Sequence, residues 1–73
     1  MLPLAFLSPG ENCRVKRIGG KDDVKRHLAN LGFVENEAIQ VVSQTGGNLI
    51  ISVKDSRIAI SKEMAQRIVV ENL

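Results

Sequence analysis

The single histidine and the single cysteine, His27 and Cys13, are the first residues whose types suggest chemistry, because both types bind transition metals. A metal site needs three or four converging ligands, and neither residue has a companion at ligand spacing. His27 lies about 60° from the middle of the apolar stripe of a predicted helix, so we expect a half-buried residue that borders the core. The alternatives are a titrating switch at His27, or a transition-metal site in which His27, Cys13 and carboxylates are the ligands.

Cys13 shares the inward phase of Val15 in a predicted strand. Nothing in the neighbouring sequence supplies the paired base that a nucleophilic thiol requires. We therefore predict that Cys13 is a small core residue, and a lone cysteine makes no internal disulfide. The cytoplasm is the expected compartment, because a chain without an internal disulfide does not require an oxidising one.

Two further patterns have catalytic counterparts but simpler explanations. The adjacent carboxylates Asp22 and Asp23 could serve acid–base chemistry, yet at the start of a helix such residues usually cap it. The pairs Gly19-Gly20 and Gly46-Gly47 lack the spacing of a phosphate-binding loop and are expected to form turns. We expect no enzymatic activity, no catalytic residues and no cofactor.

Six cations precede position 27 and face only three carboxylates there, so one end of the domain should be basic. They are Arg14, Lys16, Arg17, Lys21, Lys25 and Arg26. Such a cluster could bind a polyanion, but the net charge of +2 is mild and no aromatic stacking platform accompanies the cluster. We therefore expect this basic cluster to be a solvated or protein-docking face. The alternative is that the domain is a small barrel that binds nucleic acid.

The elements that position these residues follow from periodicity. Val24, Leu28 and Leu31 recur at i, i+4 and i+7, which predicts a helix that begins near Asp22 and packs by one face. Gly32 and Phe33 then provide a Schellman-type ending. Five short strands are predicted, at Asn12–Ile18, Ala38–Gln44, Leu49–Lys54, Arg57–Ile60 and Ile68–Val70.

Turns at residues 45–48 and at Asp55-Ser56 join the central strands into a meander, and Ser61 is expected to cap a short helical turn before the last strand. Five short strands bury an apolar face best when they close into a small barrel. We therefore predict one domain over residues 1–73, mainly β, with the architecture of a five-stranded SH3-like barrel. The helix between the first two strands would plug or flank one end of it.

No segment reaches the roughly 18 continuous apolar residues that span a bilayer. The apolar run from Met1 to Leu7 has no basic region before it and ends at Ser8-Pro9-Gly10, so it does not read as a signal peptide. The sequence thus predicts a protein that works outside the membrane.

The joint order of several weak motifs resembles the FeoA family of ferrous iron transport accessory proteins, from Leu4 to Val70. The motifs are Leu7-x-x-Gly10, Leu28-x-x-Leu31-Gly32-Phe33, the Gly46-Gly47 hairpin, Ile58-Ala59-Ile60 and Met64-Ala65-x-x-Ile68-x-Val70. Asn36 stands where many members have glycine, and asparagine is the next-best residue for a left-handed turn. The fold alone does not determine the role, because similar domains also occur at the C-terminus of iron-dependent repressors.

The resemblance implies a cytoplasmic SH3-like domain that assists FeoB, the bacterial Fe(II) permease with a cytosolic GTPase domain. The chain shows no helix-turn-helix, which favours this role over repression. We expect docking on the cytosolic region of FeoB, to regulate its activity or assembly, through the helix surface with Lys25, Arg26 and Asn30. Self-association and direct metal binding stay open.

Overall fold

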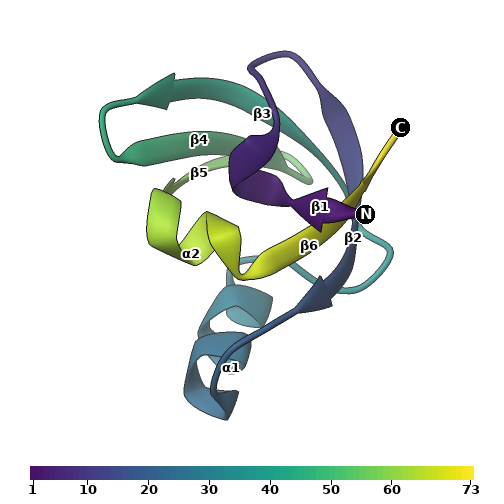
Figure 1. Ribbon diagram of the computed structural model, residues 1–73. Helices are drawn as coiled ribbons and strands as arrows, with labels where there is room; N and C mark the ends of the chain where they lie inside the picture. Colours follow the sequence, from purple (N-terminus) through teal and green to yellow (C-terminus); the bar gives the residue numbers. More distant parts are fainter.

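The long strands carry alternating aliphatic residues. The structure, a computed structural model, describes residues 1–73 (Figure 1). The elements in chain order are β1 (Leu2–Pro3), the 3-10 turn η1 (Leu4–Phe6), β2 (Asn12–Ile18), α1 (Asp22–Asn30), β3 (Ala38–Thr45), β4 (Asn48–Val53), β5 (Ser56–Ser61), α2 (Lys62–Gln66) and β6 (Ile68–Asn72). The predicted mainly-β fold, with a helix between the first two long strands and a short helix before the last, is confirmed.

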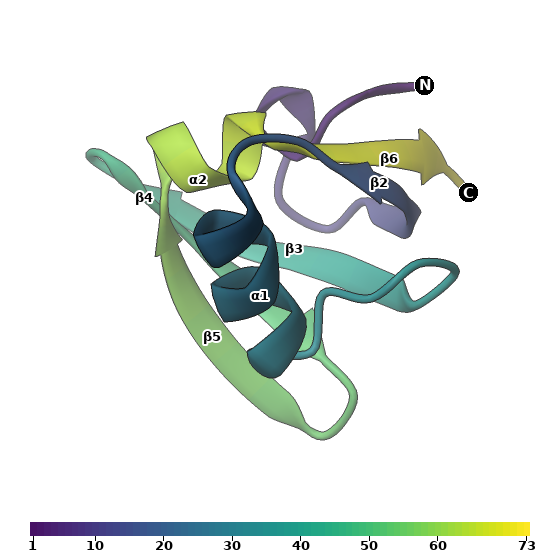
Figure 2. The same cartoon turned by 90° about the horizontal axis from the view of Figure 1, so that it is seen from below.

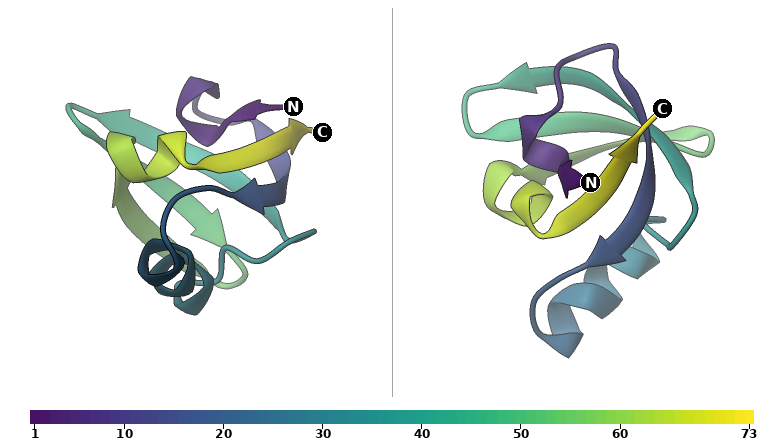
Figure 3. Two further views of the ribbon diagram at one scale, coloured as in Figure 1. Left: turned by 60° about the horizontal axis from the view of Figure 1, so that its bottom comes forward. Right: turned by 45° about the vertical axis from the view of Figure 1, so that its right-hand side comes forward.

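All strands belong to one antiparallel sheet in the order β1-β6-β2-β3-β4-β5. The sheet curls on itself, and η1 and α2 lie together over its open side (Figure 3). Because β1 and β5 do not pair, the barrel is closed there by side-chain packing rather than by a ladder of backbone hydrogen bonds.

The expected count of five strands was wrong by one, since β1 also pairs with β6. Leu2 lies opposite Val70 and Pro3 opposite Val69. A strand of two residues has no alternating pattern to reveal it, and a proline is tolerated at such a sheet edge. The N-terminal segment is therefore part of the barrel.

A β-bulge in β2 changes which side chains face the core. Val15 lies opposite Val70 and Arg17 opposite Val69, so Lys16 is the extra residue. Beyond this point the inward phase moves by one position. Ile18 then lies opposite the buried Ile68, while Arg17 is exposed.

One of the two tight turns differs by one residue from its predicted position. The β3–β4 hairpin turns at Gly46-Gly47, with Gly46 at φ 56°, as expected. The next turn is at Lys54-Asp55 rather than Asp55-Ser56, because Lys54 takes the left-handed conformation at φ 55° and Ser56 already begins β5.

The helix α1 ends as predicted but begins differently. Phe33 N–H donates to Leu28 O at 3.1 Å and Gly32 N–H to Ala29 O at 3.0 Å, which is a Schellman ending. The N-cap is Lys21, without a side-chain bond, so the prediction of an aspartate cap was wrong. Asp22 and Asp23 lie in the first turn, where their charge favours the helix dipole.

Sixteen apolar residues form one buried core, to which every long strand contributes. Leu28 of α1 is fully buried, and Val24 and Leu31 pack against the core beside it, so the predicted stripe is confirmed. The rest of α1 projects from one end of the barrel (Figures 1 and 2). The helix thus flanks the barrel and leaves most of its surface free.

Candidate functional site

Cys13 lies in β2 between Ile39 of β3 and Asn72 of β6, and its side chain is completely buried. Burial, with a smaller contribution from the charge of Glu11, raises the pKa of the thiol from its usual 9.0 to about 11. The thiol is therefore protonated at neutral pH, and the predicted core position is confirmed.

His27 is exposed in the last turn of α1, so the prediction of a half-buried residue was wrong. The helix touches the barrel only through its narrow apolar stripe, and residues beside that stripe reach solvent. No group of three His, Cys, Asp or Glu side chains comes together to form a metal centre. The structure thus does not assemble the cluster of Cys13, His27 and carboxylates that the sequence left open.

Lys25, Arg26 and Asn30, the predicted docking residues, are all exposed on α1. The other members of the basic cluster extend along β2 and the connection to the helix, so the cations follow one strand and one helix. Lys16 Nζ lies 3.7 Å from Glu71 Oε1 in a surface ion pair, which contributes little to stability. Phe33 is buried and Phe6 lies on η1, so neither aromatic ring provides an exposed stacking platform among these cations.

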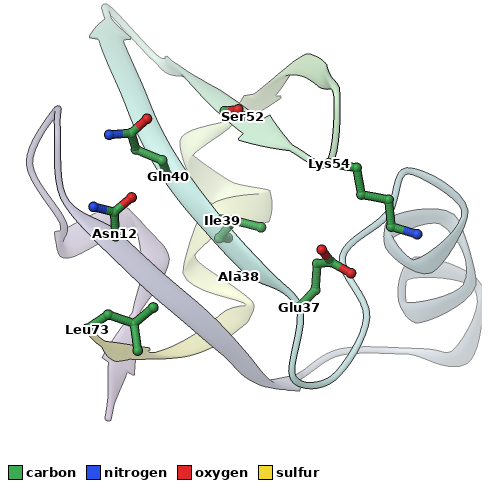
Figure 4. Close-up of a pocket in the computed structure, with 8 residues that line it drawn as sticks. All are labelled: Asn12, Glu37, Ala38, Ile39, Gln40, Ser52, Lys54 and Leu73. Atoms are coloured by element: carbon green, nitrogen blue, oxygen red, sulfur yellow. The ribbon is translucent and has the colours of Figure 1, made fainter.

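One depression, of about 350 Å³, lies on the outer face of the sheet (Figure 4). Its lining residues are Asn12, Glu37, Ala38, Ile39, Gln40, Ser52, Lys54 and Leu73. The register places Asn12 beside Gln40 and Gln40 beside Ser52, which makes a row of polar side chains across three strands. Only one carboxylate and one ammonium group border this row, so it lacks paired acid–base groups.

A second depression, of about 330 Å³, lies between β2 and α1. Its lining residues are Val15, Lys16, Arg17, Ile18, Lys25, Ala29, Phe33, Val34 and Glu35. Five of these nine residues are hydrophobic, and three of the others are cations. Lys25 is the only predicted docking residue in this groove; sequence reasoning missed the others because strand, helix and loop come together only in the fold.

The fold is a small, mainly-β barrel with two surface depressions, and comparison with known proteins assigns its family. The chain matches the FeoA domain over residues 2–72 and belongs to that family. It is 36% identical over 72 residues to the "Putative Fe(2+) transport protein A" of Methanocaldococcus jannaschii, which covers 99% of this chain and 88% of that protein. Membership supports a role in ferrous iron transport.

Solved structures agree with this assignment. A crystal structure described as the iron uptake regulatory protein FeoA superposes with a TM-score of 0.92 at 35% identity, over 99% of this chain and 96% of that one. FeoA of Stenotrophomonas maltophilia, described as an SH3 domain protein in complex with zinc, gives 0.85 at 27% identity, over 97% of this chain and 91% of that one. The predicted SH3-like class is confirmed.

A manganese-dependent transcriptional repressor shares the fold alone, with a TM-score of 0.89 at 20% identity over 97% of this chain and 41% of that protein. No helix of the present structure is both long enough and apolar enough to cross a bilayer.

Proposed function

We propose that this chain is a cytoplasmic accessory protein of ferrous iron uptake that docks on the cytosolic region of a FeoB-type permease and regulates its activity or assembly. The family match over residues 2–72 carries this proposal. The FeoA family is associated with transport as an accessory family, so the chain acts by binding rather than by catalysis.

The free surface of α1 is the proposed docking face. Lys25, Arg26 and Asn30 are exposed there, while Leu28 of the same helix is fully buried and anchors it in the core. A partner can therefore contact these side chains without disturbing the fold. Exposed charges of this kind mainly accelerate association and select the partner.

Calorimetry with the purified cytosolic region of the permease from the same organism tests this proposal. We expect the double variant Lys25→Glu/Arg26→Glu to bind roughly tenfold more weakly than the wild type, because its charges now repel an acidic partner surface. The matched control is Lys54→Glu/Arg57→Glu, which reverses two exposed cations on and beside β5. Equal affinity of both variants would exclude the α1 surface as the docking face. Absence of binding by the wild type would refute docking on the permease.

A further inference from the structure

The groove between β2 and α1 has an apolar floor. Val15 and Phe33 are fully buried beneath it, and Val34 exposes 39% of its surface at its rim. Ala29 faces the groove from the helix, and its small side chain leaves the space open. A volume of about 330 Å³ is at the lower end for ligand pockets and suits a few side chains of a partner.

The wall of this groove is a free strand edge. β2 pairs with β3 only as far as Arg14. The last hydrogen bonds from β2 to this side are Val15 N–H to Glu37 O at 2.9 Å and Asn36 N–H to Val15 O at 2.7 Å. Lys16, Arg17 and Ile18 have β6 on one side and no strand on the other. Unpaired backbone groups at such an edge can accept an additional strand.

A local turn keeps this edge open. Glu37 N–H donates to Val34 O at 3.0 Å, and Asn36 between them has φ 72°. This left-handed residue turns the chain away from β2 before β3 begins. The segment before β3 therefore does not continue the pairing, and the edge of β2 at residues 16–18 stays uncovered.

The rim of the groove is basic. Lys16, Arg17 and Lys25 line it, against the single carboxylate of Glu35. The partner of Lys16, Glu71, is 3.7 Å away and half exposed, so water and a ligand can compete for that ammonium group. Apolar and acidic side chains together would complement this surface.

We propose that this groove binds an extended segment of the partner protein, in which apolar side chains alternate with acidic ones, as an added strand along residues 16–18 of β2. The inference rests on the proposed role as a docking protein and adds the site and the chemistry of the bound segment. A second copy of this chain is a poor occupant, because pairing two such edges would bring Lys16 and Arg17 of both copies together.

The test is an NMR titration of the isotope-labelled protein with two short synthetic peptides. In one, Val and Leu alternate with Glu, and in the other the same apolar residues alternate with Lys. We expect the acidic peptide to shift the amides of residues 16–18 and 25–29 and to bind at least roughly tenfold more tightly than the basic peptide. Shifts outside the groove, equal binding of both peptides, or no shifts at near-millimolar peptide would overturn the proposal.

Variants separate the groove from general charge attraction. Ala29→Glu fills the groove and adds a repelling carboxylate, so binding of the acidic peptide should be lost while the spectrum of the free protein stays folded. Ala59→Glu makes the same substitution, and the same change in charge, at an exposed position of β5 and should bind as the wild type does. Unchanged binding by Ala29→Glu would contradict the proposal.

The peptide experiment contains no permease, so its outcome is independent of the calorimetric test above. If the permease binds and the acidic peptide does not, docking stands and this groove is not its site. If the peptide binds and the permease does not, the groove recognises another acidic partner.

Discussion

Gly32 ends α1 at a point where the chain passes very close to β4. Its φ is +109°, a conformation that strongly favours glycine. A Cβ atom at this position would lie only 2.8 Å from Cγ1 of Val53, which is itself buried. The residue therefore meets two demands at once, a left-handed backbone and a close approach of helix end to sheet.

We expect Gly32→Ala to lower the free energy of unfolding by about 2–4 kcal/mol, the sum of backbone strain and overpacking. Gly46→Ala is the matched control, because Gly46 is also left-handed at φ +56° but its Cβ would meet open space. Urea titration should give a loss of about 1 kcal/mol for the control. Equal losses for the two variants would show that the contact with Val53 is unimportant.

The buried thiol of Cys13 predicts a specific dependence of stability on pH. Its pKa is about 11 in the folded protein against a usual 9.0, so unfolding at high pH releases a proton. The stabilisation is complete below pH 9 and is lost as the pH rises from 9 to 11. We expect the wild type to lose roughly 2 kcal/mol more than Cys13→Ala over this range, measured by urea unfolding. Parallel curves for the two proteins would contradict this account.

At the scale of elements, several local signals in the sequence were sufficient. The stripe of α1, its glycine ending and the Ser61 cap were all predictable, because each acts within a few neighbouring residues. The bulge at Lys16 was not, since its cause is the pairing of β2 with β6, far away in sequence. The same long-range pairing determines that Arg17 faces the groove.

The short helix α2 depends on its cap. The Ser61 hydroxyl accepts a hydrogen bond from Met64 N–H at 3.2 Å, and the five residues of α2 are too few to be stable alone. We expect Ser61→Ala to cost about 1 kcal/mol of unfolding free energy, by chemical denaturation. Ser56→Ala, at an exposed position in β5, is the control and should change stability by less than about 0.5 kcal/mol. A similar cost for both would remove the cap from the explanation.

At the scale of the whole molecule, the N-terminal segment completes the barrel. Leu4 and Leu7 are buried in the core, and the Gln44 side chain donates to Leu7 O at 2.7 Å. Glu11 accepts from Ser8 N–H and from Asn72 Nδ2, which lowers the pKa of its carboxyl group and joins this segment to β6. The sequence shows an apolar run there but not its position over the open side of the sheet.

This closure predicts unequal effects for two neighbours in η1. Leu4 is completely buried, whereas Phe6 exposes 69% of its surface. We expect Leu4→Ala to cost about 2–5 kcal/mol, a large part of the stability of so small a domain. Phe6→Ala should cost less than about 1 kcal/mol. Thermal unfolding of both variants measures this, and equal melting temperatures would show that the segment is not part of the core.

The candidate site could be predicted only in part, for the same physical reason. Lys25 is recognisable as an exposed cation on a helix, but the groove beside it needs Val15, Phe33 and Val34 from separate elements. His27 was misplaced because periodicity gives the direction of a side chain and not how far the barrel extends beneath it. Chemistry that depends on neighbours distant in sequence became visible only in the fold.

The most direct measurement is an NMR titration of the labelled protein with the cytosolic GTPase region of the FeoB-type permease from the same organism. We expect the shifts to cluster on α1 and on residues 16–18 of β2, with the outer face of the sheet around Gln40 unchanged. No shifts at near-millimolar partner, or shifts spread evenly over the barrel, would contradict the claim that this protein docks on the permease through α1 and the adjacent edge of β2.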